Sequence, residues 1–224
     1  MNLIVFDIDG TLIDSVKIDD KCFIQTFQLL HKIDLENADW NNFKNVTDSG
    51  LTNEIFENHY GRLPTESEVN KVKDIFYSLL KQRDHEMSEI IGANTALRSL
   101  INHPEFTVAF ATGGWKETAL LKLSAIGFDI GELTLVSAND FTKRSEITNL
   151  AISRSLAKTG LREFSTITYV GDGLWDWKTT NELGINFIGI DYHNTNKLKQ
   201  AGAVQILNDL NNLDLIISWA KGHT

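Results

Sequence analysis

The sequence predicts an α/β protein, in which a parallel sheet with helices on both faces is interrupted near its N-terminus by an all-helical insertion. Residues 1–7 read as a buried strand, because four consecutive apolar residues lead to an acid and Gly10 follows. Residues 15–92 have helical periodicity and no convincing strand. From residue 93 onward, short apolar runs alternate with helical patterns. This alternation predicts parallel strands joined by helical crossovers.

The insertion is expected to hold two long amphipathic helices. Apolar residues recur at helical spacing from Ile18 to Ile33, and a second stripe follows Pro64 and continues to Ile91. The polar segment between them has a turn signal at 47–50, followed by a short helix. Two interpretations of residues 47–50 remain open: a loop that faces a ligand, or only a turn.

The second part of the chain supplies the other strands. Strands are expected at 106–111, 133–137, 166–170, 186–190 and 204–207. Helices are expected at 115–126, 145–157 and 175–183, in a short segment ending at 201, and at 213–219. The first strand belongs to this sheet, because one strand beside a helical block is not stable alone. The predicted domains are therefore a Rossmann-like core of residues 1–14 and 93–224, and a helical domain of residues 15–92.

The composition excludes several function classes. Lys and Arg number 21 against 30 Asp and Glu, so the formal net charge is −9. This balance argues against nucleic acid or an anionic membrane as the main partner, because both require a basic surface. The one cysteine, Cys22, permits no internal disulfide, and no apolar run approaches the ~20 residues that span a bilayer. We expect a soluble cytoplasmic protein, with no indication of its oligomeric state.

Two acids follow the first strand. Asp7 and Asp9 are separated by one residue, and residues i and i+2 of an extended segment point the same way, about 6.6 Å apart. Ligands of an open parallel sheet bind at the carboxyl ends of its strands. Two carboxylates there could hold a small hard cation and leave an oxygen free to react. Gly10 lets the chain turn away sharply.

The ends of later strands add complementary groups. Thr112 and Gly113, with a second glycine and a helix start directly after them, form a cradle for an anion. Asp172 follows the strand at 166–170, and the side chain of Asp176, in the first turn of the next helix, can point toward Asp172. Asp176 could instead only complement the helix dipole. Lys143 and Arg144 lie near another strand-to-helix crossover on this face; each could also be an ordinary solvated cation.

These motifs resemble those of the haloacid dehalogenase-like (HAD) superfamily. The segment Asp7-Ile8-Asp9-Gly10-Thr11-Leu12 fits its first motif, Thr112-Gly113 its second, and residues 171–176 (GDGLWD) its fourth. The insertion resembles the helical cap of that family, and the whole chain is similar to its phosphatase branch, which includes phosphoglycolate phosphatases. The resemblance implies a Mg²⁺-dependent phosphatase that acts on a small phosphorylated metabolite.

The resemblance also implies roles for the residues. Asp7 would be the nucleophile that becomes an aspartyl phosphate, and Asp9 would be the general acid and then the general base. Mg²⁺ would lie between the Asp7 carboxylate, the Asp9 backbone carbonyl and the Asp172 carboxylate. Thr112 and the Gly113 amide would hold phosphate oxygens. Relatives that break carbon–halogen or carbon–phosphorus bonds lack the second acid, so the pair favours phosphate esters.

Two points stay open after the resemblance. Asp176 would act from outside the metal shell, by orienting the cation or its water. The third motif departs from the usual Lys-Pro pair and has Lys143 followed by Arg144, so either cation could reach the phosphate; we slightly favour Lys143. The alternative function is a phosphomutase, in which the aspartyl phosphate returns to a sugar rather than to water.

Overall fold

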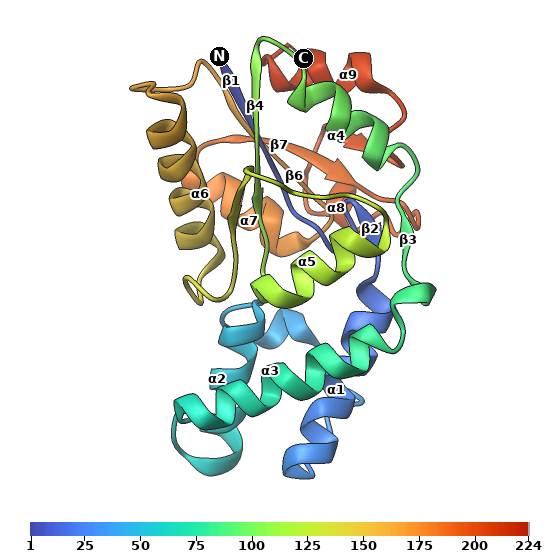
Figure 1. The fold of residues 1–224 in the computed structure, drawn as a ribbon, viewed down its shortest axis with the longest axis vertical. Helices are drawn as coiled ribbons and strands as arrows, with labels where there is room; N and C mark the ends of the chain where they lie inside the picture. The colour runs from blue at the N-terminus through green and yellow to red at the C-terminus, as the bar shows by residue number, and fades with distance from the viewer. Residues whose placement is uncertain (224) are drawn as a thin grey trace.

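The computed structural model describes residues 1–223 and confirms the α/β fold class. Its main sheet has six parallel strands in the order β5-β4-β1-β6-β7-β8 (Figure 1). The strands are β1 (Asn2–Phe6), β4 (Phe106–Ala111), β5 (Thr134–Val136), β6 (Ile167–Gly171), β7 (Asn186–Ile190) and β8 (Ile206–Leu207). The first strand therefore lies in the middle of the sheet, between β4 and β6.

The sheet is covered on both faces, as its mostly apolar and largely buried strands require. Alternate residues of β1 enter two separate cores: Ile4 and Phe6 pack on one side, and Leu3 and Val5 on the other. The helices beside the sheet are α4 (Ala93–Ile101), α5 (Lys116–Ala125), α6 (Arg144–Thr159), α7 (Leu174–Leu183), α8 (Lys197–Gln200) and α9 (Leu213–Ala220). Apolar residues of α4, α5 and α9 contribute to the first core, and those of α6, α7 and α8 to the second.

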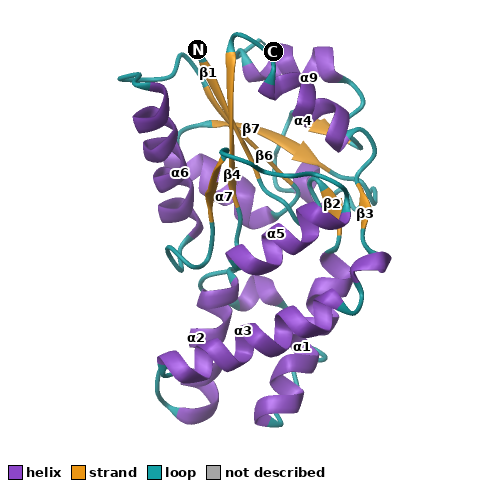
Figure 2. Ribbon diagram, in the orientation of Figure 1, coloured by secondary structure: helices purple, strands orange, loops and turns teal. Residues whose placement is uncertain are grey.

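Three further helices lie together beyond the carboxyl end of β1 (Figure 2). They are α1 (Val16–His31), α2 (Asp48–Tyr60) and α3 (Glu66–Lys81), with short 3-10 turns η1 (Trp40–Asn42) and η2 (Asp84–Glu86). Phe23 of α1 packs edge-to-face against Phe76 of α3, with ring centroids 5.4 Å apart. A capping box at Thr65 and Glu68 starts α3, which explains why this helix begins directly after Pro64.

The chain enters and leaves this helical region through a small two-stranded sheet. Strand β2 (Ile13–Asp14) pairs antiparallel with β3 (Ser88–Glu89). The expectation of no strand within residues 15–92 is therefore wrong, because β3 is held by its partner and not by an apolar pattern of its own. The second long helix is also shorter than its apolar stripe, since α3 ends at Lys81 and a 3-10 turn follows.

The other elements follow the predicted order with shifts at their ends. Strands β4 and β7 have the predicted bounds, whereas β8 is shorter than predicted, and α4 was not predicted. The segment 47–50 is neither a free loop nor an isolated turn: Thr47 caps α2, and its hydroxyl accepts a hydrogen bond from the Gly50 amide at 3.0 Å. Over residues 1–223, no helix combines the length and the apolar character needed to cross a membrane.

Candidate active site

The predicted site residues come from the carboxyl ends of three neighbouring strands. Asp7 follows β1, Thr112 follows β4, and Asp172 follows β6 directly. Because β1 pairs with both β4 and β6 in parallel, these three ends meet at one edge of the sheet. The arrangement puts the motifs side by side although they are far apart in the sequence.

Three carboxylates form a compact buried cluster at this edge. One oxygen from each of Asp7, Asp172 and Asp176 lies within 4.8 Å of the others, and all three side chains are buried. Gly10 makes this packing possible: its φ of +72° is in the left-handed region, and a Cβ there would lie 2.5 Å from the Asp172 carboxylate. Asp176 thus lies in the cluster itself, and it also accepts a hydrogen bond from the Gly173 amide at 2.9 Å.

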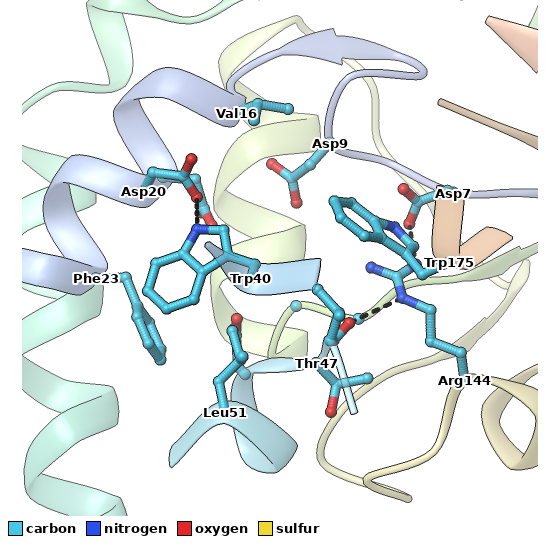
Figure 3. A pocket seen from close by; sticks show the side chains of 15 residues that line it. Asp7, Asp9, Val16, Asp20, Phe23, Trp40, Thr47, Leu51, Arg144 and Trp175 are labelled. Carbon is cyan, nitrogen blue, oxygen red and sulfur yellow. Dashed lines mark hydrogen bonds and ion pairs between the residues drawn. The ribbon is translucent and has the colours of Figure 1, made fainter. Parts of the chain in front are cut away.

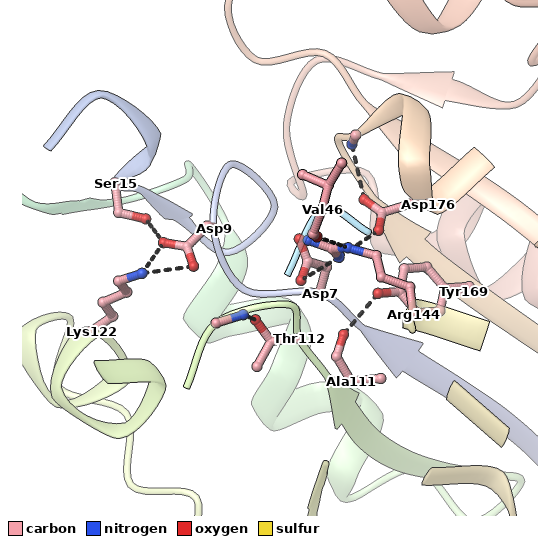
Figure 4. Close-up of polar contacts among 12 residues, drawn as sticks. Asp7, Asp9, Ser15, Val46, Ala111, Thr112, Lys122, Arg144, Tyr169 and Asp176 are labelled. Carbon is pink, nitrogen blue, oxygen red and sulfur yellow. Dashed lines mark hydrogen bonds and ion pairs between the residues drawn. The ribbon is translucent and has the colours of Figure 1, made fainter. Parts of the chain in front are cut away.

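Arg144 is the buried cation beside the cluster, and the half-exposed Lys197 also pairs with Asp172 at 3.4 Å. Its Nη1 lies 2.9 Å from Asp176 Oδ1 and 3.5 Å from Asp7 Oδ1, and its Nε donates to the Val46 carbonyl at 2.9 Å (Figure 4). A side chain at position 113 would collide with the guanidinium, so Gly113 leaves the space that Arg144 occupies.

Lys143 does not reach the cluster: it pairs with Glu182, and its side chain is 49% exposed. This placement reverses the sequence preference for Lys143.

Asp9 lies across the site from Arg144 and does not join the carboxylate cluster (Figure 4). Its carboxylate accepts hydrogen bonds from the Ser15 hydroxyl and from Lys122 Nζ, the latter at 2.7 and 2.8 Å. The two acids of the first motif therefore hold separate positions, because the chain leaves β1 at Phe6 and turns at Gly10.

Lys122 is a residue that the sequence interpretation missed. It lies on α5 with its side chain only 1% exposed, and it bridges Asp9 to Asp19 of α1. A signal was present in the sequence: Lys122 falls on the apolar stripe of Ala119 and Leu123, where a cation must have a partner. The pair with Asp19 joins the sheet region to the helical region through buried charges.

The start of α2 forms a second connection between these regions. The Asp48 amide donates to the Gly113 carbonyl at 2.8 Å, and the Asp48 carboxylate accepts from the Trp115 amide at 2.7 Å. Thr47 and Ser49 donate to backbone carbonyls of the 138–142 loop at 2.7 and 2.6 Å. This segment therefore packs against Gly113 and the 138–142 loop, and Thr47 and Asp48 line the cavity described next.

A cavity of about 110 Å³ lies between the two regions (Figure 3). Asp7, Asp9, Gly113, Gly114, Arg144 and Trp175 line it from the sheet side. The helical region contributes Val16, Asp19, Asp20, Phe23, Trp40, Val46, Thr47, Asp48 and Leu51. Thr112 lies just behind the lining, buried, with its hydroxyl accepting a hydrogen bond from the Gly114 amide at 3.1 Å. Of the predicted residues, Asp7, Asp9, Gly113 and Arg144 therefore line one cavity. Asp172 and Asp176 lie outside the lining and touch it through their cluster with Asp7.

The electrostatics of the cluster favour a bound cation. Burial raises the pKa of Asp7 to about 8; Asp176 adds to this shift, and Arg144 opposes it. Burial also raises the pKa values of Asp172 and Asp176 to about 6. Asp172 Oδ1 is buried without a hydrogen-bond partner. A divalent cation would satisfy this oxygen and offset the crowded charges, and carboxylate oxygens are the ligands that Mg²⁺ prefers, so the residues fit this ion.

Comparison with known proteins agrees with this geometry. The family described as haloacid dehalogenase-like hydrolase matches residues 4–190. No curated protein matches the chain. Among solved structures, a hydrolase from Pseudomonas syringae is 20% identical over the full length of both chains, with a TM-score of 0.73.

Two further structures have the same fold. CbbY from Rhodobacter sphaeroides, in complex with phosphate, is 17% identical, covers 95% of this chain and 96% of its own, and has a TM-score of 0.70. A predicted phosphoglycolate phosphatase from Haemophilus somnus is 18% identical, covers 97% and 98%, and has a TM-score of 0.67. At these identities the structures support the fold alone, whereas the family match spans most of the chain. The chain therefore belongs to the haloacid dehalogenase-like hydrolase family.

Proposed function

We propose that the protein is a Mg²⁺-dependent phosphatase that hydrolyses a small phosphorylated metabolite through an aspartyl phosphate. The observation that carries the proposal is the buried cluster of Asp7, Asp172 and Asp176, from which Asp7 reaches one small cavity that Arg144 also lines. A cation and a phosphate group would together balance this concentration of charge.

In the proposed reaction, an Asp7 oxygen attacks the phosphorus atom. The bond between phosphorus and the ester oxygen breaks, and the alcohol leaves with a proton. Water then attacks the acyl phosphate, which releases inorganic phosphate and restores the Asp7 carboxylate. Two steps replace one difficult displacement by water. The position of Asp7 at the end of β1 supports this role, because a central strand fixes it rigidly.

Asp9 is proposed to hand the proton to the leaving oxygen and then to take one from the attacking water. It lines the cavity, and the hydrogen bonds from Ser15 and Lys122 fix its orientation. Arg144, the Gly113 amide and the Thr112 hydroxyl are proposed to hold the phosphate oxygens. Arg144 suits this role, because a guanidinium offers parallel donors to two oxygens of one phosphate.

Asp7, Asp172 and the backbone carbonyl of Asp9 would hold Mg²⁺, and Asp176 would orient Arg144 and the cluster. When bound, the ion supplies positive charge that offsets the carboxylates and the phosphate during the reaction. The unpartnered Asp172 Oδ1 supports this assignment.

Residues 15–92 are proposed to act as a cap that covers the cavity. Val46, Thr47 and Asp48 line the cavity and hydrogen-bond to the sheet side, which supports closure over a bound substrate. Strands β2 and β3 lie where the chain crosses between the two parts, so they are the natural hinge.

The test is hydrolysis of p-nitrophenyl phosphate with and without Mg²⁺. We expect activity that depends on Mg²⁺ and that Asp7→Asn abolishes. The matched control is Asp214→Asn, which changes an exposed aspartate on α9 far from the site, and it should keep full activity. Full activity in Asp7→Asn would refute the proposal.

A further inference from the structure

The two ends of the cavity differ in chemistry (Figure 3). The reacting end has Asp7 and Arg144. The opposite end, formed by the helical region, has an apolar wall and three acids, and the substrate's alcohol portion would lie there. The apolar wall consists of Val16, Phe23, Trp40 and Leu51, and the acids are Asp19, Asp20 and Asp48.

Within residues 1–223, no cation lines the alcohol end. Lys197 lies beside this end, in an adjoining hollow that Asp20, Trp40 and Trp175 also line, and it already pairs with Asp172 at 3.4 Å. Among the residues described, 1–223, Arg144 is the one cation that lines the cavity, and Asp176 and the Val46 carbonyl already engage it. Lys122 lies behind the lining, buried between Asp9 and Asp19. Lys17 and Lys21 of α1 are exposed and lie outside the lining. A carboxylate or phosphate of the substrate at this end would lie against the acids of the protein, and no cation of the lining there would pair with it.

Asp20 offers an acceptor at this end. One of its oxygens accepts a hydrogen bond from Trp40 Nε1 at 3.0 Å, which fixes the carboxylate beside the aromatic wall. The rings of Phe23 and Trp40 are perpendicular, with centroids 5.8 Å apart. A carboxylate oxygen next to aromatic rings binds a hydroxyl group or an ammonium ion, and it repels an anion.

We infer that the substrate is a phosphate monoester of a neutral or ammonium-bearing alcohol, and that esters with a second anion, such as phosphoglycolate or a bisphosphate, are rejected. This inference rests on the proposed function for the location of the phosphate end. Asp20 is the specificity-determining residue, because it is the acid at the alcohol end that is paired neither with Lys122 nor with the Trp115 amide.

The test uses three two-carbon esters that differ in one group: 2-hydroxyethyl phosphate, 2-aminoethyl phosphate and phosphoglycolate. Their dissociation constants are measured by calorimetry with the Asp7→Asn protein and Mg²⁺, so that binding is compared without turnover. We expect phosphoglycolate to bind about tenfold or more weakly than the other two, since tenfold corresponds to ~1.4 kcal/mol, a modest cost for an unpaired anion. Equal or tighter binding of phosphoglycolate, or no binding of the other two, overturns the inference.

Asp20→Asn in the same background tests the proposed residue. The amide oxygen can still accept from Trp40, so the wall stays in place while the charge is lost. We expect phosphoglycolate to bind more tightly, 2-aminoethyl phosphate more weakly and 2-hydroxyethyl phosphate about equally. Asp74→Asn, at an exposed position of α3 outside the cavity, should change none of the three.

An unchanged order of the three affinities in Asp20→Asn would show that Asp20 does not determine the specificity. The outcome is separable from that of the proposed function: p-nitrophenyl phosphate hydrolysis that needs Asp7, together with tight binding of phosphoglycolate, would keep the phosphatase and reject the inference.

Discussion

Replacing Lys122 by Met tests the charged connection between α5 and α1. Methionine has a similar length and fits an apolar helix face, so the substitution removes the charge with little change in volume. Lys122 is 1% exposed, and the side chains of its partners Asp9 and Asp19 are 20% and 19% exposed. The variant therefore leaves two largely buried carboxylates without their cation.

The expected loss of stability is large. Removing one partner of a buried ion pair costs about 3–5 kcal/mol, because the remaining charge is left uncompensated. For a chain of this size, each kcal/mol lowers Tm by about 2–4 °C, so the loss corresponds to roughly 6–20 °C. Lys116→Met is the control: Lys116 is exposed at the start of α5, and its replacement should stay within about 0.5 kcal/mol of the wild type.

The pH dependence gives the prediction a second readout. Burial raises the pKa of Asp19 well above its usual value, although Lys122 opposes this shift. A carboxyl group with a raised folded-state pKa favours folding at low pH, and this contribution is lost as the pH rises through the folded pKa. Without Lys122, we expect the stability loss to be small near pH 4 and largest above pH 7, by thermal unfolding followed with circular dichroism. A Tm within about 2 °C of the wild type at pH 7.5, less than one kcal/mol, would refute the reasoning.

Other consequences can be measured on the same preparations. Arg144→Ala should raise KM for p-nitrophenyl phosphate about tenfold or more, from ~1.5–3 kcal/mol per charged hydrogen bond, whereas Lys143→Ala should leave it within about twofold. Burial raises the pKa of Asp48 to about 6, so the wild type loses stability as this carboxyl group ionises between pH 4 and pH 7, whereas the amide of Asp48→Asn does not ionise. The free energy of unfolding of Asp48→Asn should therefore rise relative to that of the wild type by on the order of 2 kcal/mol over this pH range. Saturating Mg²⁺ should raise Tm more at pH 8 than at pH 5.5, since its ligands must be deprotonated. Asp172→Asn should abolish that rise; an undiminished rise would remove Asp172 from the metal site.

The sequence predicts the sheet well where strands carry their own signal. Strands β1 and β4 are mostly apolar and almost wholly buried, which requires a sheet covered on both faces, and that pattern predicts their ends to within one residue. Strand β3 is two polar residues, Ser88 and Glu89, and it exists because Ile13 and Asp14 lie opposite. Local periodicity cannot reveal a pairing made across the fold.

In the site, too, some residues can be predicted from the local sequence and others depend on tertiary contacts. The acids at strand ends follow from the motifs, because sequence position and strand direction fix where they lie. The choice between Lys143 and Arg144 depends on where α6 begins: Lys143 precedes the helix and turns to Glu182, whereas Arg144 is its first residue and points at Asp176. Lys122 reaches Asp9 only because α5 packs against the start of α1, which is a tertiary contact.

The most direct test of the phosphatase mechanism is to trap the phosphorylated protein. Asp9→Asn is mixed with p-nitrophenyl phosphate and Mg²⁺, quenched in acid and analysed by mass spectrometry. p-Nitrophenolate leaves without a proton, so phosphorylation can proceed, while hydrolysis lacks its general base. We expect one phosphate adduct, located on Asp7. An adduct on another residue, or hydrolysis by Asp7→Asn at the wild-type rate, would contradict this mechanism.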